Sequence, residues 1–312
     1  MTKKLISILT PCFNEESNLA LLVDAVKKIF DNLPDYNYEH VFIDNHSTDR
    51  SLEILKGIAQ NNKNVKIIVN ARNFGWIKSP FYGLVQCKGD AVVYLVADFQ
   101  DPVELILDFV KKWEEGYEIV IGVKTQSKEN ALMFGVRKFF YNLLSSASDG
   151  EPIIKNFTGF GLYDQKFIKI LGNLEDQYPY LRGLVTELGF NRYEIPYTQP
   201  KRFAGKTSSN FFKLYDVAML GFTSHSKLPL RLSAFVGFFS AIISFLVAVG
   251  YFIYKMVYWY EFQIGTAPMV IGIFFFSSVQ LFFIGIIGEY IGAIHTQIRK
   301  RPLVIERERI NF

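Results

Sequence analysis

The chain has 312 residues, of which 50% are hydrophobic, 30 are Phe and 21% are charged, with a formal net charge of +4. This length allows about two domains, and a positive mean hydropathy beside so many charges indicates a soluble part joined to a membrane part. The small net charge and the lack of a basic stripe with interleaved aromatics argue against nucleic-acid binding. Cys12 and Cys87 lie far apart without metal-ligand spacing, so we expect reduced thiols in a cytoplasmic domain.

Strands and helices alternate in the first part of the chain. The sequence predicts strands at 5–10, 39–43, 65–69, 92–97 and 118–123, and helices at 19–30, 52–59 and 103–113. The first strand is too short for the apolar region of a signal peptide. Strands that alternate with helices and end in polar residues imply a doubly wound, mostly parallel α/β sheet. No G-x-G-x-x-G follows the first strand, which argues against a dinucleotide-binding fold of the usual kind.

The pattern is looser from residue 124 onward. We expect a helix at 131–144, a short strand or Gly-rich loop at 156–163, a helix at 178–188 and a strand at 190–197. A basic loop with small residues follows at Lys201–Ser209. Such loops are mobile and commonly functional.

The last third of the chain has the features of a membrane part. Residues 211–227 alternate large apolar residues with charges and suit a helix in the membrane interface. Charge-free spans at 232–254 and 262–288 are each long enough to cross a bilayer. Basic residues flank the spans on the side away from the aromatic link Tyr258–Tyr260, so the positive-inside rule places both termini in the cytoplasm. Gly272, Gly285, Gly288 and Gly292 could pack the second span against a neighbouring copy.

The residues after the apolar run at 92–97 carry the first chemical signal. In an open α/β sheet, ligands bind at the carboxyl ends of the strands. Asp98, Gln100 and Asp101 would therefore project into a site, with oxygen ligands suited to Mg²⁺ or Mn²⁺. A helix N-cap before Pro102 could explain Asp101, but it leaves Asp98 and Gln100 unexplained.

Polar residues follow the other strands as well, and all of these ends should converge on one cleft. Together they supply acceptors for a base and a ribose, and a metal for a pyrophosphate. The segments are Asn14-Glu15, Asp44, Arg72-Asn73 and Asp98-x-Gln100.

These segments resemble a known family. The motifs are Pro11-x-Phe13-Asn14-Glu15-Glu16, Asp44-Asn45-x-Ser47-Thr48-Asp49, Arg72-Asn73-Phe74-Gly75 and Asp98-x-Gln100-Asp101-Pro102-x-Glu104. They resemble the family 2 inverting glycosyltransferases, and within them the polyisoprenyl-phosphate branch of dolichyl-phosphate mannose synthases and bactoprenol glucosyltransferases. Gly205-Lys206-x-Ser208 and Pro229-Leu230-x-Leu232 before two spans are similar to the bacterial members.

The resemblance implies the nucleotide-diphosphosugar transferase fold, followed by interfacial helices and two transmembrane helices. It implies transfer of a hexose from a nucleoside-diphosphate sugar to polyprenyl phosphate at the cytoplasmic face of a bacterial inner membrane. UDP-glucose and undecaprenyl phosphate are the first choice of substrates, and GDP-mannose is the alternative donor. The expected parts are a catalytic domain at 1–205, an interfacial region at 206–229, a two-helix hairpin at 230–295 and a cytoplasmic basic tail at 296–312.

The resemblance also assigns residues. Asp98 and Gln100 would bind Mg²⁺ or Mn²⁺ on the pyrophosphate, with Glu15 and Asp44 on the ribose and base. The expected donor site consists of Pro11, Asn14, Glu15, Asp44, Arg72, Asn73 and Asp98. Two phosphate groups must be held together against their repulsion, so basic residues should bind the acceptor phosphate. The expected acceptor residues are Arg137, Arg202, Lys206 and Ser208, with Lys124 a weaker choice.

Two positions depart from the family pattern. Ala97 stands where a second acidic residue usually begins the metal motif, and Asn45 replaces the second Asp after the second strand. With one carboxylate fewer, metal affinity should fall and more ligands must come from phosphate and water.

Two other readings compete with this one. A processive polysaccharide synthase needs a Gln-x-x-Arg-Trp motif and several spans, which the chain does not have. A non-catalytic membrane scaffold with a degenerate transferase fold would account for Ala97. The presence of Glu15, Asp44, Asp98 and Gln100 argues against it.

Overall fold

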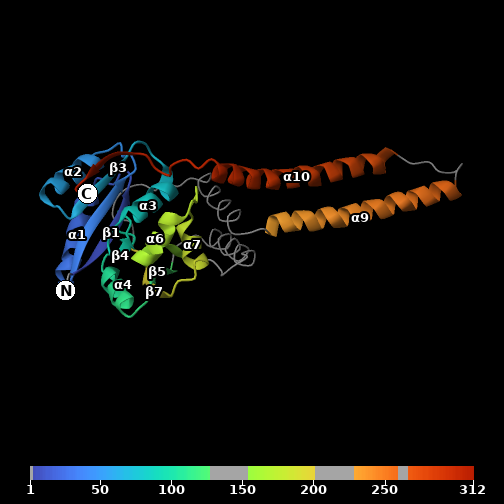
Figure 1. Ribbon diagram of the computed structural model, residues 1–312. Coiled ribbons are helices and arrows are strands. Elements are labelled where there is room, and N and C mark those ends of the chain that lie inside the picture. The colour runs from blue at the N-terminus through green and yellow to red at the C-terminus, as the bar shows by residue number, and fades with distance from the viewer. Residues whose placement is uncertain (1–2, 127–153, 201–227, 259–265) are drawn as a thin grey trace.

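The computed structural model describes residues 3–126, 154–200, 228–258 and 266–312. The expected helices at 131–144 and 211–227 and the basic loop Lys201–Ser209 lie outside these residues. An α/β domain forms one end of the molecule, and two long helices project from it (Figure 1).

The centre of the domain is an eight-stranded sheet with the order β7-β5-β6-β4-β1-β2-β3-β8. Strands β3, β2, β1 and β4 are parallel to one another, and β5 is parallel to β7. Strand β6 is antiparallel to both β4 and β5, and β8 is antiparallel to β3. The strands are β1 (Lys4–Cys12), β2 (Tyr36–Asp44), β3 (Val65–Asn70), β4 (Ala91–Tyr94), β5 (Ile119–Gln126), β6 (Phe157–Asp164), β7 (Arg192–Thr198) and β8 (Glu306–Ile310).

Helices cover both faces of this sheet. One face packs against α1 (Leu19–Asp31), α2 (Ser51–Asn61) and α4 (Leu105–Glu114). The other packs against α3 (Gly75–Gln86), α6 (Gln165–Asn173) and α7 (Leu181–Glu187). The doubly wound, mostly parallel α/β fold is therefore confirmed.

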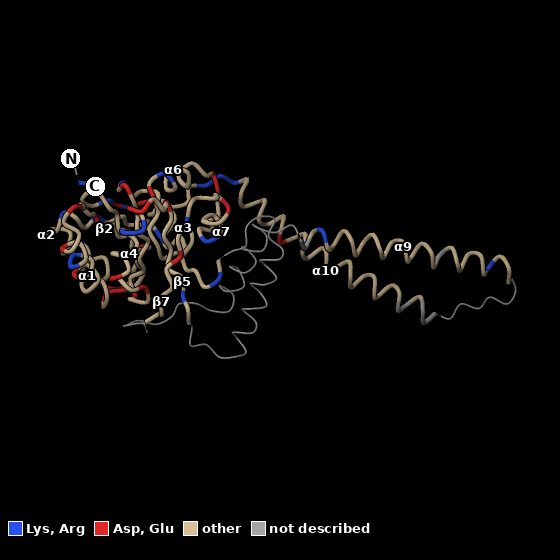
Figure 2. The backbone as a smooth tube through the Cα atoms, turned by 90° about the horizontal axis from the view of Figure 1, so that it is seen from below, with Lys and Arg blue, Asp and Glu red and all other residues tan. Residues whose placement is uncertain are grey.

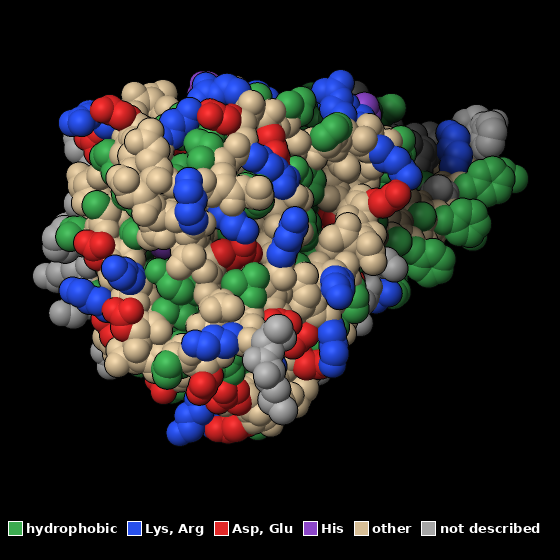
Figure 3. Space-filling model, turned by 60° about the vertical axis from the view of Figure 1, so that its left-hand side comes forward, with side chains coloured by type: hydrophobic (Ala, Val, Ile, Leu, Met, Phe, Trp, Pro, Cys, Tyr) green, Lys and Arg blue, Asp and Glu red, His purple; other side chains and the backbone are tan. Residues whose placement is uncertain are grey.

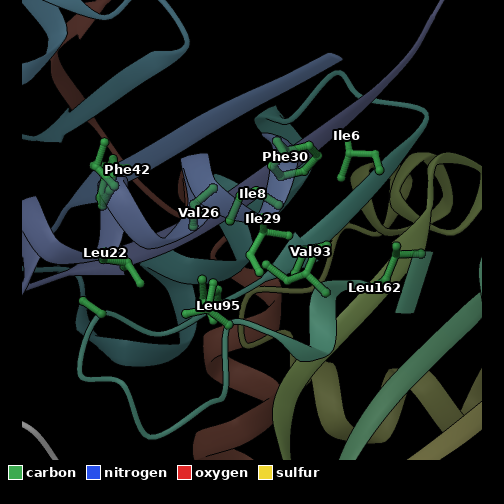
Figure 4. Packing of buried hydrophobic residues seen from close by; sticks show 14 of the residues in the cluster. Ile6, Ile8, Leu22, Val26, Ile29, Phe30, Phe42, Val93, Leu95 and Leu162 are labelled. Carbon is green, nitrogen blue, oxygen red and sulfur yellow. The ribbon is translucent and has the colours of Figure 1, made fainter. Parts of the chain in front are cut away.

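The two cores follow from the alternation of side chains along each strand. On β2, Phe42 enters one core, while Val41 and Ile43 enter the other. Figure 4 shows the first core, where Val26 of α1 packs toward Ile8 of β1. Both residues are completely buried, and each such aliphatic side chain stabilises the fold by roughly 1.5–3 kcal/mol.

Strand β4 and helices α3 and α6 differ from the prediction. Strand β4 ends at Tyr94 rather than continuing to Ala97, although Leu95 N still donates to Leu9 O at 2.9 Å. Helix α3 was not predicted, and Pro80 lies inside it. Helix α6 was also missed, although Asp164 caps it by accepting a hydrogen bond from Lys166 N at 2.8 Å.

The C-terminal segment 296–312 was expected to be a basic tail, but the structure makes part of it an edge strand. Strand β8 pairs antiparallel with β3. Tyr82 OH donates to Glu306 at 2.8 Å, and Asn311 Nδ2 donates to the carbonyls of Ala59 and Val65 at 2.8 and 2.9 Å. The chain thus returns from the long helices to the sheet. A short charged edge strand has little apolar alternation, which explains why the sequence pattern concealed it.

The two long helices are α9 (Leu228–Val257) and α10 (Thr266–Ile298). They run side by side away from the domain (Figures 1 and 2). Leu230–Val257 and Gly272–Ile298 are long and apolar enough to cross a membrane, with mean hydropathies of 2.4 and 1.7. Exposed hydrophobic side chains gather on this projection, whereas acidic and basic side chains are mixed over the domain (Figure 3). The molecule therefore has two candidate membrane spans where the sequence predicts them.

Candidate active site at the strand ends

The register of the sheet brings the polar strand ends together. Cys12 is paired with Asp44 across β1 and β2, and Leu9 with Tyr94 across β1 and β4. Asn45 N continues the β1–β2 ladder by donating to Cys12 O at 2.9 Å. The segments that begin after Cys12, Asp44 and Tyr94 therefore leave the same end of the sheet from adjacent strands, where the sequence predicts a shared site.

Each of these three segments contains a residue with positive φ. The values are 58° for Asn14, 66° for His46 and 56° for Phe99. A non-glycine residue pays roughly 1–2 kcal/mol for this left-handed conformation. Strained backbone of this kind concentrates at functional sites, where the surrounding structure holds it. The strained backbone after β1, β2 and β4 therefore supports a functional site at the carboxyl ends of these strands.

Hydrogen bonds join the segments after β1 and β2. Asn14 Oδ1 accepts from Thr48 N at 2.8 Å, and Asn14 N donates to Ser47 Oγ at 3.0 Å. Ser47 N is shared between both oxygens of the Asp44 carboxylate, each at 3.3 Å. Asn14 therefore links the two segments, and its side chain has a structural task beside any contact with a donor.

Glu15 and Asp44 lie close to Cys12. Burial is the main cause that raises the pKa of the Cys12 thiol, and the negative charges of Asp44 and then Glu15 add to the rise. The thiol stays protonated at neutral pH and is a poor nucleophile. Pro11, Cys12, Glu15 and Asp44 thus form one acidic corner, in which Asp44 is 1% exposed and Glu15 accepts a hydrogen bond from Asn18 Nδ2 at 2.7 Å.

Asn45 connects this corner to the end of β3. Its Oδ1 accepts from Asn70 Nδ2 at 3.0 Å and from Phe74 N at 2.9 Å. Its Nδ2 donates to Asn73 Oδ1 and to Gly75 O, both at 3.1 Å. The amide uses both its donor and its acceptor capacity, which a carboxylate could not do. The departure from Asp at this position is therefore accounted for by the fold.

Asn73 lies beside the acidic corner, whereas Arg72 lies at a pocket next to α10. The Asn45 bond holds Asn73 against the acidic corner. The Arg72 guanidinium lies over the Phe74 ring at 4.1 Å from its centroid and donates to Asn73 O at 2.9 Å. Arg72 is exposed and lines a pocket beside the end of α10.

The segment after β4 supplies Asp98 and Gln100. Asp98 is 7% exposed, and its Oδ1 accepts from Gln100 N at 3.1 Å. The part of the chain that the structure describes contains no group of three or more His, Cys, Asp or Glu that could hold a metal ion. Mg²⁺ is commonly bound by one or two carboxylates together with substrate phosphates and water. The Asp98 carboxylate and the Gln100 amide are oxygen ligands of the kind that such a cation takes. Metal binding by these two residues stays a prediction.

Asp101 is buried against the other half of the sheet. Its Oδ1 accepts from Tyr197 OH at 2.8 Å. Burial raises the pKa of Asp101 to about 6, the charge of Asp98 adds to this, and the Tyr197 bond and Lys124 oppose it. Helix α4 begins only at Leu105, so the alternative of Asp101 as its N-cap is wrong.

Tyr197 was not predicted as a site residue. Tyr197 lies near the end of β7, just before the basic loop. This position is the feature of the sequence that could have marked it as a site residue. Its contact with Asp101 joins β7 to the segment after β4. The remaining predicted acceptor residues, Arg137, Arg202, Lys206 and Ser208, lie outside the described residues.

Comparisons with known proteins identify the family of the chain. Residues 7–172 match the model of glycosyl transferase family 2. An uncharacterized glycosyltransferase of Bacillus subtilis, YkcC, is 35% identical over 96% of this chain and 92% of its own. The bactoprenol glucosyl transferase of Shigella phage SfX is 32% identical over 97% of this chain and 99% of its own.

Solved structures support the same fold. Glucosyl-3-phosphoglycerate synthase from Mycobacterium tuberculosis, crystallised with Mn²⁺, UDP-glucose and phosphoglyceric acid, aligns with a TM-score of 0.50. It is 16% identical, and the match covers 70% of this chain and 78% of that one. The expected family is confirmed by the family model and the relatives together. The chain belongs to glycosyl transferase family 2 and is a glycosyltransferase.

Proposed function

We propose that the protein transfers a hexose from a nucleoside-diphosphate sugar to polyprenyl phosphate, with inversion, at the cytoplasmic membrane face. Glucose from UDP-glucose and undecaprenyl phosphate are the first-choice substrates, and the product is a polyprenyl-phosphate sugar for cell-surface glycans. One observation carries the proposal: similarity to proteins named bactoprenol glucosyl transferase extends over both the α/β domain and the two candidate spans.

The reaction makes modest chemical demands on the protein. An oxygen of the acceptor phosphate attacks the anomeric carbon, and the bond from that carbon to the donor β-phosphate breaks. The nucleoside diphosphate leaves with the bonding electrons. The attacking phosphate is already ionised, so no strong general base is needed. The protein must position two anionic groups and stabilise the leaving one.

The strand-end residues suit these tasks. In the proposal, Glu15 and Asp44 accept hydrogen bonds from the hydroxyl and base groups of a nucleoside. Asp98 and Gln100 would hold Mg²⁺ or Mn²⁺, which supplies positive charge to the leaving pyrophosphate. Asp101, held by Tyr197, fixes the shape of the segment that carries Asp98. In the proposal, Arg202 and Lys206 bind the acceptor phosphate.

The membrane part explains why the acceptor should be a lipid. A polyprenyl chain that left the bilayer would lose roughly 0.8 kcal/mol for each exposed CH₂ group. Its phosphate must therefore be met near the membrane surface. The end of α10 meets the α/β domain (Figure 1), so a bilayer spanned by α10 would have its surface next to the domain.

The test is a direct assay. Membranes containing the protein are incubated with radiolabelled UDP-glucose, GDP-mannose and other sugar nucleotides, together with undecaprenyl phosphate. We expect label in the lipid with UDP-glucose. Label with GDP-mannose alone would select the mannosyl alternative. No labelled lipid with any donor would contradict the proposal and favour the scaffold reading.

A further inference from the structure

A basic pocket lies where α10 meets the α/β domain. Its volume is about 460 Å³, and three separate stretches of chain form its wall. The β3–α3 region, the segment after α6 and the residues following α10 each contribute. Its charged and aromatic lining residues are Arg72, Lys78, Arg299, Arg301, Phe74 and Tyr178.

The charges of this pocket are unbalanced. No Asp or Glu is among the described residues that line it. Burial, and then the positive charges of Arg72 and Arg299, lower the pKa of Lys78, with Asp176 nearby as an opposing negative charge. Cations held together in this way disfavour one another's charged forms. A bound anion would relieve that repulsion.

Aromatic rings hold two of the cations without neutralising them. The Lys78 ammonium lies 5.1 Å from the centroid of the Tyr178 ring. The Arg72 guanidinium lies over Phe74. Such contacts orient a cation, while its charge stays available to a ligand.

The wall between α10 and the domain is fixed by specific bonds. Gln297 Nε2 donates to Asp176 Oδ1 at 2.6 Å, and Gln177 N donates to Gln297 Oε1 at 2.9 Å. Lys300 pairs with Glu175 at 2.6 Å just outside the pocket. The pocket is therefore assembled by the docking of α10 onto the domain.

The position of the pocket along α10 indicates what reaches it. The candidate span ends at Ile298, and Arg299 and Arg301 follow directly. Residues that directly follow a span lie in the headgroup layer of a bilayer. Phosphate is the anionic group that membrane lipids present at that depth, and guanidinium groups bind it with matching geometry.

We propose that this pocket binds the phosphate group of an anionic membrane lipid and so holds the α/β domain against the bilayer surface. The inference rests on the membrane placement in the proposed function, but not on the transfer reaction. General attraction of juxtamembrane charges to anionic lipids needs only the residues beside the span. The pocket also uses Lys78 from α3, and this difference makes the proposal testable.

The test measures lipid binding to the full-length chain. Detergent-purified protein is titrated with phosphatidylglycerol, and bound lipid is counted by native mass spectrometry. The double variant Lys78→Gln/Arg299→Gln should bind about tenfold more weakly, because it loses two charged partners of the phosphate. The matched control Lys27→Gln/Arg307→Gln removes two exposed basic side chains outside the pocket and should bind like the unaltered protein. Equal weakening in both double variants, or weakening in neither with any of the lipids tested, would overturn the proposal.

Further arms identify the source of the phosphate. A loss seen with phosphatidylglycerol supports a structural phospholipid, and a loss seen only with undecaprenyl phosphate supports the acceptor itself as the bound lipid. Inorganic phosphate that binds as tightly as either lipid would contradict a lipid site. Asp98→Asn should keep full lipid binding, so failure of the transfer reaction and failure of this pocket give different results.

Discussion

Asp98 is the residue on which the proposed chemistry depends most. It is the carboxylate at the end of the β4 segment, where the family pattern would have a second acidic residue at Ala97. We expect Asp98→Asn to lower turnover about a thousandfold, since a preorganised charge clamp on the leaving group contributes several kcal/mol. The measurement is labelled-lipid formation at saturating Mn²⁺.

The control for this variant is Asp108→Asn, which removes an exposed carboxylate from the first turn of α4. It should leave turnover unchanged. An Asp98→Asn enzyme that retained a tenth of normal turnover would remove Asp98 from the centre of the site.

Asn45 leads to a prediction opposite to the one that the family pattern suggests. Asn45→Asp restores the family's carboxylate, but it places negative charge against Asn73 Oδ1 and Gly75 O, which now accept hydrogen bonds from the amide. We expect a loss of about 1–3 kcal/mol in unfolding free energy, without tighter Mn²⁺ binding. Chemical unfolding and calorimetric Mn²⁺ titration check the two parts.

Asn37→Asp, at an exposed position on β2, is the matched control and should be neutral. Tighter Mn²⁺ binding by Asn45→Asp with unchanged stability would show that Asn45 is a missing metal ligand rather than a structural amide.

His40 makes stability depend on pH. Its Nε2 lies 2.9 Å from Thr10 Oγ1, its Nδ1 is buried without a hydrogen-bond partner in the described structure, and burial lowers its pKa to about 3. The folded state therefore favours neutral His40. Its contribution is complete above the unfolded pKa of about 6.5 and is lost as pH falls toward 3.

Urea unfolding of the detergent-solubilised chain at several pH values measures this effect. Between pH 6 and 4 the unfolding free energy should fall by up to about 1.4 kcal/mol per pH unit from this one group. His40→Gln should remove that slope, while His295→Gln, at an exposed position, should keep it. An unchanged slope in His40→Gln would refute the assignment.

At the level of elements, the sequence predicted the helices and strands whose apolar residues recur at regular spacing. The strands at β1, β2 and β3 and helices α1 and α4 combine regular apolar spacing with polar ends, and the structure has them within a few residues. Helix α3 was hidden by Pro80, and β8 by its alternating charges. The site residues that directly follow a strand could be predicted from the sequence. Tyr197 could not be predicted, because its contact with Asp101 joins residues 96 positions apart.

Strand β8 provides the element-scale prediction. Removing residues 306–312 exposes the edge of β3 and deletes the Asn311 bonds to α2 and β3. We expect a loss of roughly 2–4 kcal/mol, which corresponds to a fall of about 5–15 °C in Tm for a domain of this size. Differential scanning fluorimetry of the full-length and shortened chains measures it.

Two point variants sharpen that comparison. Asn311→Ala should show a smaller fall of the same sign, and Arg307→Ala, at an exposed position on the strand, should show none. A shortened chain that melts like the intact one would mean that β8 contributes nothing to the domain.

At the scale of the whole molecule, the two candidate spans begin and end on the side of the same domain. The start of α9 and the end of α10 lie on the domain side, and their link lies at the far end (Figures 1 and 2). Because β8 lies in the sheet, the C-terminus is on that side as well. The two candidate spans therefore lie as a hairpin, and if they cross a bilayer, a single orientation decides on which side the α/β domain lies.

The distribution of basic residues predicts that orientation. Arg231 at the start of α9 and Arg299, Lys300 and Arg301 after α10 lie on the domain side, whereas Lys255 stands near the far end of α9. The positive-inside rule then places the domain in the cytoplasm, where nucleotide sugars are made, and the link outside. Alkaline phosphatase fused at Glu261 should be active, and green fluorescent protein fused there should be dark. The reverse pattern, with phosphatase active only after Phe312, would place the strand-end site on the side without donor and would refute the proposed function.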